Sequence, residues 1–153
     1  MARLETLPEA FREHLANLPC PSFGDAPWVG GPPLNRRRVA LISTAGLHRR
    51  GDRPFAAWSG EYRVIPGDLA AADLVMSHIS SNFDRSGFQQ DWNLMFPLDR
   101  LRELTAQGVI GSLAAYHYSF MGASDPAVME PFVPELVDLL KRDRVDAVLL
   151  VPV

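Results

Sequence analysis

The chain has 153 residues, of which 47% are hydrophobic and 22% charged, and this fits one globular domain with a buried core. Its net charge of −3 gives no general attraction to nucleic acid or to an anionic membrane, and no apolar run approaches the roughly 18 residues of a membrane span. The single cysteine, Cys20, excludes an internal disulfide and suits a reducing compartment. We therefore expect a cytoplasmic protein with neither nucleic acid nor membrane as a partner.

Residues 1–35 predict a helix followed by an extended arm. Leucine or phenylalanine recurs every three or four residues between positions 4 and 18, which is typical of an amphipathic helix. Residues 19–35 contain five prolines and three glycines, and these favour an extended arm over a packed element. Trp28 within this arm indicates that it lies against a surface, either its own or a partner's.

Residues 36–153 predict an α/β domain. The expected strands are residues 39–43, 62–66, 73–80, 109–115 and 146–153, and the expected helices are residues 97–107 and 126–142. Prolines in the second helix are expected to kink or delay it. The alternation favours a mostly parallel sheet flanked by helices, which binds ligands beyond the carboxyl ends of its strands. Polar residues are expected at three such ends: Thr44 to His48, His78 to Asp84, and His117 to Tyr118.

The turn after the first strand is a candidate binding site. It matches neither the phosphate loop of nucleoside triphosphatases nor the glycine pattern of dinucleotide-binding domains. Thr44, Gly46 and His48 could still hold a carboxylate or phosphate through a hydroxyl and backbone amides. The alternative is a plain turn between a strand and a loop.

Two histidines are candidate acid–base groups. Histidine titrates near neutrality, so His78 and His117 are suited to proton transfer, with Asp84, Asp91 and Tyr118 as candidate partners. The alternative is that each histidine is a hydrogen-bonded residue at the edge of the core. His78, His117 and the two aspartates also combine side chains that suit zinc or iron(II), although their spacing matches no compact ligand motif.

A group of aromatic residues accompanies these polar side chains. It consists of Phe83, Phe88, Trp92 and Phe96. These rings either pack as core beneath a long loop or form a lid over a small ligand. Cys20 has no neighbouring base in the sequence, so we expect an incidental thiol there and not a catalytic one.

Several segments together resemble one family. They are Arg38 to His48, Tyr62 to Pro66, Ser77 to His78, Asn82 to Asp84, Asp91, Asn93, Phe96 to Leu101, Gly108 to Gly111, His117 to Gly122 and Val145 to Val153. On these segments, residues 36–153 resemble the selenoprotein B family of glycine/sarcosine/betaine reductases and the related D-proline reductase subunit, as a short cysteine-type relative.

The resemblance implies reductive chemistry on a small amino-acid-like or carboxylate substrate. In that family a selenocysteine or cysteine just after the last strand attacks the substrate carbon, a pyruvoyl subunit activates the amine, and a thiol relay restores the reduced state. For this chain it implies that His78 and His117 donate protons or orient the substrate, without a metal or a bound cofactor. The implied substrate-binding residues are Thr44, Gly46, His48, Asp84, Asp91, Asn93 and Tyr118.

The redox motif of the family would begin where the last matching segment ends, at Val153. We therefore expect the thiol or selenol in a following segment or in another chain, so that residues 36–153 form an incomplete reductase-like domain. A partner subunit or a thiol reductant protein is expected beside the small-molecule substrate. Two alternatives stay open. The first is a non-catalytic binding or assembly subunit whose residues 1–35 embrace a partner or a second copy, with a homodimer expected. The second is a metal-dependent enzyme that uses His78, Asp84 and His117.

Overall fold

The computed structural model describes residues 4–17, 29–80 and 83–153. It divides into two units, Met1–Gly30 and Gly31–Val153. In the first unit a short 3-10 turn, η1 (Leu4–Thr6), and a helix, α1 (Glu9–Ala16), take the place of the single helix expected over residues 4–18. Pro8 separates them, because its extended backbone interrupts the helix. Leu18, Cys20 and Trp28 lie outside the described residues.

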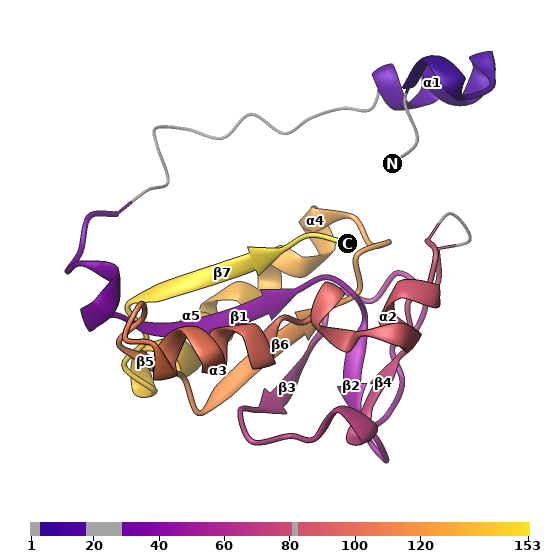
Figure 1. Ribbon diagram of the computed structural model, residues 1–153. Coiled ribbons are helices and arrows are strands. Elements are labelled where there is room, and N and C mark those ends of the chain that lie inside the picture. The colour runs from indigo at the N-terminus through magenta and orange to yellow at the C-terminus, as the bar shows by residue number, and fades with distance from the viewer. Residues whose placement is uncertain (1–3, 18–28, 81–82) are drawn as a thin grey trace. The chain divides into compact units, whose positions relative to one another are not determined.

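The second unit is built on a mixed, mostly parallel sheet. Its strands are β1 (Arg38–Ser43), β3 (Tyr62–Pro66), β5 (Ser112–Leu113), β6 (Tyr116–Phe120) and β7 (Ala147–Val151). The central strand is β1, which pairs in parallel with β7 on one side and with β5 and then β6 on the other, while β3 pairs antiparallel with β6. This confirms the expected α/β fold (Figure 1).

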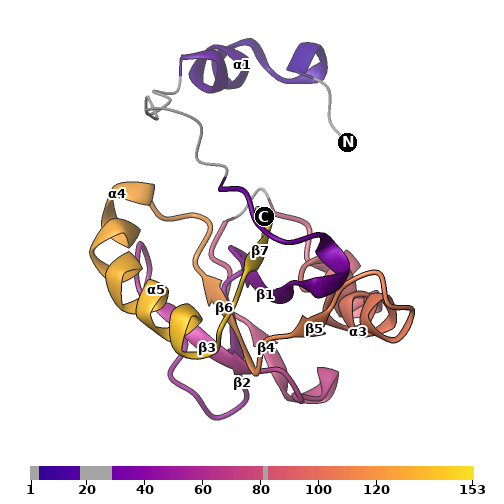
Figure 2. The same cartoon turned by 90° about the vertical axis from the view of Figure 1, so that its left-hand side faces the viewer.

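Helices cover both faces of this sheet, as Figure 2 shows. On one face lies α3 (Leu98–Ala106), over a core that includes the fully buried Leu41, Ile65 and Phe96. On the other face lie α4 (Pro126–Met129) and α5 (Val133–Arg142), over a smaller core of Tyr118, Phe120 and Leu136. A 3-10 turn, η5 (Glu130–Phe132), joins these two helices, so prolines interrupt the helix expected over residues 126–142, as predicted.

A second, two-stranded sheet lies beside the first and was not predicted. It pairs β2 (Leu47–Arg49) antiparallel with β4 (Leu74–Met76), after the 3-10 turn η3 (Ala71–Asp73). The strand expected over residues 73–80 is therefore shorter than predicted and does not join the main sheet. The chain then continues through α2 (Ser86–Gln90) and the 3-10 turn η4 (Trp92–Leu94).

The strand expected over residues 109–115 was wrong in its position. The turn after α3 uses residues 107–111, where Gly108 has a φ of +71°, and only Ser112–Leu113 then pairs with β1. The main strand follows at Tyr116–Phe120, so His117 and Tyr118 lie near the beginning of β6 and not beyond its carboxyl end. No helix within the described segments has the length and hydropathy needed to cross a membrane.

Candidate functional site

Three parallel strands end at the same edge of the sheet, and Thr44 links them. The Thr44 amide donates to Val151 O (3.1 Å), and the Thr44 carbonyl accepts from the Gly122 amide (2.7 Å). The Thr44 hydroxyl accepts from the amide of Val153 (2.8 Å). One residue thus holds the ends of β1, β6 and β7 together, at the edge where an α/β sheet binds ligands.

Two glycines allow the backbone to pack closely at this edge. Gly46 has a φ of +66°, and a Cβ there would lie 3.0 Å from the backbone nitrogen of His78. A Cβ on Gly122 would lie 2.5 Å from Val153 O and 2.6 Å from Thr44 O. Larger residues would push these segments apart, so the two glycines set the spacing of the strand ends.

His78 is buried beside this edge, with one ring nitrogen unused. Its Nδ1 accepts from the Ser80 amide (3.2 Å), so the proton of the neutral ring is on Nε2. Burial, and then the nearby Arg85 guanidinium, lower the pKa of His78 and favour this neutral form. The backbone of Val153 opposes that shift, although it forms no well-aligned hydrogen bond with Nε2. His78 therefore offers a buried N–H donor that has no partner within the described chain.

The neighbours of His78 fix its ring and bring a cation close to it. The Phe83 ring lies 4.7 Å from the imidazole, centroid to centroid. The Arg85 guanidinium donates to the His78 carbonyl. Arg85 was not predicted from the sequence, although an arginine seven residues after a candidate histidine in the same loop was a usable signal.

The turn that was expected to hold a carboxylate uses its own amides internally. The amides of Thr44, Gly46 and Leu47 donate to Val151 O, Phe120 O and Ser119 Oγ. The Ala45 amide donates to Ser43 Oγ (3.2 Å). The geometry thus favours the alternative of a structural turn, and the binding role of Thr44 and Gly46 stays a prediction.

His48 lies in the small sheet and has both ring nitrogens engaged. Its Nδ1 donates to Arg49 O (3.0 Å), and its Nε2 accepts from Ser77 Oγ (2.7 Å). The ring packs edge-on against Phe55. These contacts make His48 a link between β2 and the segment after β4, with no free group directed at a ligand.

His117 lies in the middle of the sheet, among core residues. Its Nδ1 accepts from the Leu41 amide (3.0 Å), and its Nε2 has no partner in the described chain. The residue is fully buried, and the Phe96 ring meets it edge-on. Burial lowers the pKa of His117 to about 4, so the ring is neutral near pH 7. The structure does not bring His117 to the strand ends where His78 lies.

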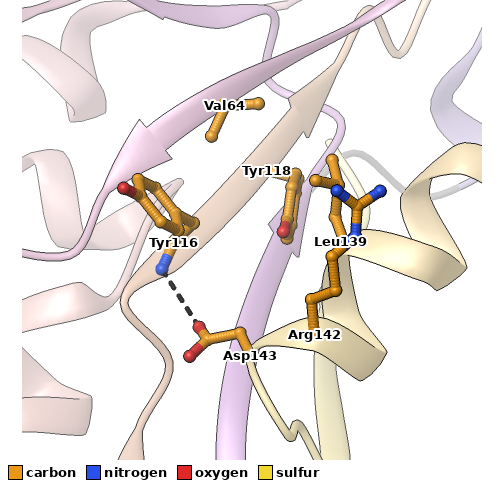
Figure 3. Close-up of a pocket in the computed structure, with 6 residues that line it drawn as sticks. All are labelled: Val64, Tyr116, Tyr118, Leu139, Arg142 and Asp143. Carbon is orange, nitrogen blue, oxygen red and sulfur yellow. Dashed lines mark hydrogen bonds between the residues drawn. The ribbon is translucent and has the colours of Figure 1, made fainter.

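Tyr118 follows His117 and faces the opposite side of the sheet, because alternate residues of a strand point to opposite faces. Its ring packs in the core beneath α5, edge-on against Tyr62. A hollow of 380 Å³ on this face is lined in part by Tyr116 and Tyr118 (Figure 3). This hollow was not predicted, because the lining residues of β3, β6 and α5 are far apart in the sequence.

The predicted acidic residues stabilise local turns. Asp84 is exposed and accepts from the Ser86 amide (2.9 Å), which lowers its pKa. Asp91 accepts from the side-chain amide of Asn93 (2.9 Å) and from its backbone amide (2.9 Å), and this lowers the pKa of Asp91. The Asn93 Oδ1 accepts from the Asp99 amide (3.0 Å) at the start of α3. None of these hydrogen bonds reaches His78 or His117.

The aromatic residues at positions 83–96 were expected either to pack in the core or to form a lid over a ligand. Phe96 is fully buried, and Phe88 and Trp92 pack against the same core, which favours core packing. Phe83 instead lies on the His78 ring. Within residues 4–17, 29–80 and 83–153, no three histidine, cysteine, aspartate or glutamate side chains come together as metal ligands do. The proposed set of His78, Asp84 and His117 is therefore not assembled.

The fold and this edge define an α/β domain with a candidate small-molecule site where three parallel strands end. The chain belongs to the glycine/sarcosine/betaine reductase selenoprotein B family, whose model matches residues 18–153. No solved structure matches the chain.

Curated relatives carry reductase names. The chain is 39% identical over 120 residues to the D-proline reductase subunit gamma of Acetoanaerobium sticklandii, covering 76% of this chain and 49% of that protein. It is 30% identical over 142 residues to the glycine reductase complex component B subunit gamma of Symbiobacterium thermophilum, covering 86% and 32%. The chain thus spans about half or one third of the length of these relatives.

Proposed function

We propose that this chain forms the substrate-orienting part of a cytoplasmic reductase that acts on a small amino-acid-like carboxylate. A thiol or selenol, supplied by a following segment or by a partner subunit, would approach the edge where β1, β6 and β7 end. The observation that carries the proposal is the buried Nε2 of His78 at this edge, which forms no well-aligned hydrogen bond with any described residue, the nearby Val153 backbone included. Residues 36–153 would form the reductase-like body, preceded by the arm.

His78 would orient the substrate by donating a hydrogen bond. A neutral imidazole is a poor proton donor, and its lowered pKa keeps His78 neutral near pH 7. Its N–H and the Arg85 guanidinium could hold a carboxylate between them, because both groups are donors. This proposal assigns the ligand contact to His78 and not to His117, whose ring is enclosed by the core.

The substrate panel comes from the names of the relatives: glycine, sarcosine, betaine and D-proline. We expect at least one of them to bind saturably in isothermal titration calorimetry. His78→Asn keeps an acceptor for the Ser80 amide but loses the Nε2 donor, so it should weaken that binding roughly tenfold. His14→Asn changes an exposed histidine of α1 and serves as the control. Equal affinity of wild type and His78→Asn, with both proteins folded, would remove His78 from the site.

A second role, assembly, is favoured by the free edge of β7. Among the described residues, β7 pairs only with β1. Its middle residues Val148, Leu149 and Leu150 are 38%, 38% and 67% exposed. Edge strands without charges or prolines readily pair with another chain. We propose a second copy of this chain as the occupant, since two β7 strands related by a two-fold axis would pair antiparallel and join their sheets.

Sedimentation equilibrium tests this assembly. We expect wild type to dimerise, and Leu150→Lys to shift it toward monomer by at least tenfold in dissociation constant, because a charge at the joined edge must be desolvated. Val109→Lys, at another exposed apolar position (44% exposed), should leave the dimer unchanged. A wild-type protein that stays monomeric at high concentration contradicts the proposal, as does a dimer that Leu150→Lys does not affect.

A further inference from the structure

The hollow of 380 Å³ beneath α5 is distinct from the strand-end site. Tyr116 and Tyr118 line it from the beginning of β6, and Leu139, Arg142 and Asp143 line it from the C-terminal end of α5, as Figure 3 shows; Val64 of β3 completes it. Because β1 and β6 run parallel, this hollow lies toward the amino ends of the strands. Thr44 and His78 lie at the carboxyl ends.

The walls of the hollow are mainly apolar. Val64 is 40% exposed and Tyr116 is 49% exposed, so part of each side chain stays open to solvent in the described chain. Leu139 packs against the small core beneath α5 and forms another wall. Ligand pockets usually have volumes of about 300–1,000 Å³, so the hollow suits a small molecule with an apolar or aromatic body.

The single carboxylate of the hollow is already fully used. Asp143 Oδ1 accepts from Nε (3.1 Å) and Nη2 (2.5 Å) of Arg38. Its Oδ2 accepts from the amides of Ala115 (2.6 Å) and Tyr116 (3.4 Å). This carboxylate therefore has little capacity left to bind a cationic ligand.

Two further polar groups of the hollow, the Arg142 guanidinium and the Tyr118 hydroxyl, are hydrogen-bond donors. The Arg142 side chain forms no ion pair or hydrogen bond within the described segments. Tyr118 is only 1% exposed, and its hydroxyl has no hydrogen-bond partner in those segments. Burial raises the pKa of Tyr118 to about 12, so the hydroxyl keeps its proton near neutrality. Both groups would therefore be satisfied by an acceptor on a ligand.

We propose that this hollow binds a small organic monoanion, an aryl or branched aliphatic carboxylate, with its carboxylate on Arg142 and Tyr118 and its body against Val64, Tyr116 and Leu139. A single charge fits better than a phosphate ester, because the C-terminal end of a helix carries partial negative charge that disfavours a dianion. The site is separate from the strand-end edge and does not depend on the proposed reductase function.

Phenylacetate is the probe, and benzyl alcohol and benzylamine are its neutral and cationic counterparts. We expect saturable binding of phenylacetate to the full chain, followed by NMR, with shifts centred on Tyr116, Tyr118 and Leu139. Benzyl alcohol should bind roughly tenfold more weakly, because it lacks the charge-assisted contact with Arg142. Benzylamine should bind no better than the alcohol.

Matched variants test the two donors. Arg142→Gln should weaken phenylacetate binding roughly tenfold, and Tyr118→Phe should weaken it severalfold. Lys141→Gln removes a neighbouring charge from the same helix end but does not line the hollow, so it should bind like wild type. His78→Asn should also bind phenylacetate normally, which separates this inference from the proposed function.

Three outcomes would overturn the inference. The first is equal affinity for phenylacetate and benzyl alcohol, and the second is unchanged binding in a folded Arg142→Gln protein. The third is a set of ligand-induced shifts centred on Thr44 and His78 in place of the residues that line the hollow. The thermal melting of each variant establishes that it is folded before binding is compared.

Discussion

Replacing Asp143 with alanine is expected to lower the free energy of unfolding by about 3 kcal/mol, because the change leaves a partly buried arginine and two amides without their acceptor. Asp143 follows α5, and its side chain is 15% exposed. Through one carboxylate it joins the end of α5 to Arg38 of β1 and to the break between β5 and β6. Chemical denaturation at pH 7 measures the loss.

The pKa of Asp143 provides an independent check on this network. Partial burial alone would raise that pKa, but hydrogen bonds from Arg38 and from the Ala115 and Tyr116 amides outweigh the burial and lower it. The stabilisation is therefore present above the ordinary pKa of an aspartate and is lost as the pH falls through the lowered value.

Asp138→Ala is the matched control for Asp143→Ala. Asp138 is exposed on the same helix, and its side chain has no hydrogen bond or ion pair within the described residues, so its removal should change the stability by no more than about 0.5 kcal/mol. If the two variants proved equally stable, the hydrogen bonds and ion pair of Asp143 would contribute no more to stability than an exposed surface charge does, which would contradict the prediction.

The sequence predicted those parts of the fold that depend on local pattern. The apolar run at residues 39–43, the repeat of Leu98 and Leu101, and the apolar end of the chain all form the expected elements. It misplaced β6, because the segment Val109 to Ala115 is as apolar as a strand although its first three residues belong to the turn after α3. Gly108 has a φ of +71° in that turn, and Gly111 lies so close to the backbone of Arg36 and Arg37 that a Cβ would clash there. The contact of Gly111 spans many residues of sequence, so local pattern does not reveal it.

The sequence predicted where some candidate residues lie better than it predicted what their side chains contact. Ligand sites lie beyond the ends of parallel strands, and this rule directed attention to the region of Thr44 and His78, whose role in binding stays a prediction. The same rule made His117 a candidate for the site only because the strand before it was predicted at residues 109–115, and β6 in fact begins at Tyr116. Some polar groups in this region already have hydrogen-bond partners that are distant in sequence. His48 bonds to Ser77, and the Leu47 amide donates to Ser119. Spacing along the chain does not reveal these partners.

A second large effect is expected from His117 at acidic pH. Burial lowers the pKa of His117 from 6.5 to about 4 in the folded chain. In the unfolded chain the His117 ring therefore binds a proton below about pH 6.5, whereas in the folded chain it binds one only below about pH 4. The free energy of unfolding should fall across this interval by about 3 kcal/mol through this one residue. Above pH 6.5 the ring is neutral in both states, and its contribution no longer depends on pH.

His117→Asn removes this pH dependence. The Asn Oδ1 can accept from the Leu41 amide in place of Nδ1, but the smaller side chain leaves a cavity, so the variant should lose about 2 kcal/mol at pH 7. Between pH 7 and pH 4, however, its unfolding free energy should fall by about 3 kcal/mol less than that of wild type. Denaturation at a series of pH values measures both quantities, and His14→Asn should follow the wild-type curve.

A direct measurement keeps this prediction testable even where His117→Asn folds poorly. The ring carbon-bound protons of His117 in the wild-type protein should titrate near pH 4 in NMR spectra. A titration near pH 6.5 would mean that solvent or another chain reaches Nε2. The conclusion that this ring is buried would then be wrong. In that case His117 would again be a candidate for the proton-transfer role predicted for it. A value near 4 leaves His78 as the histidine with a free donor at the strand ends.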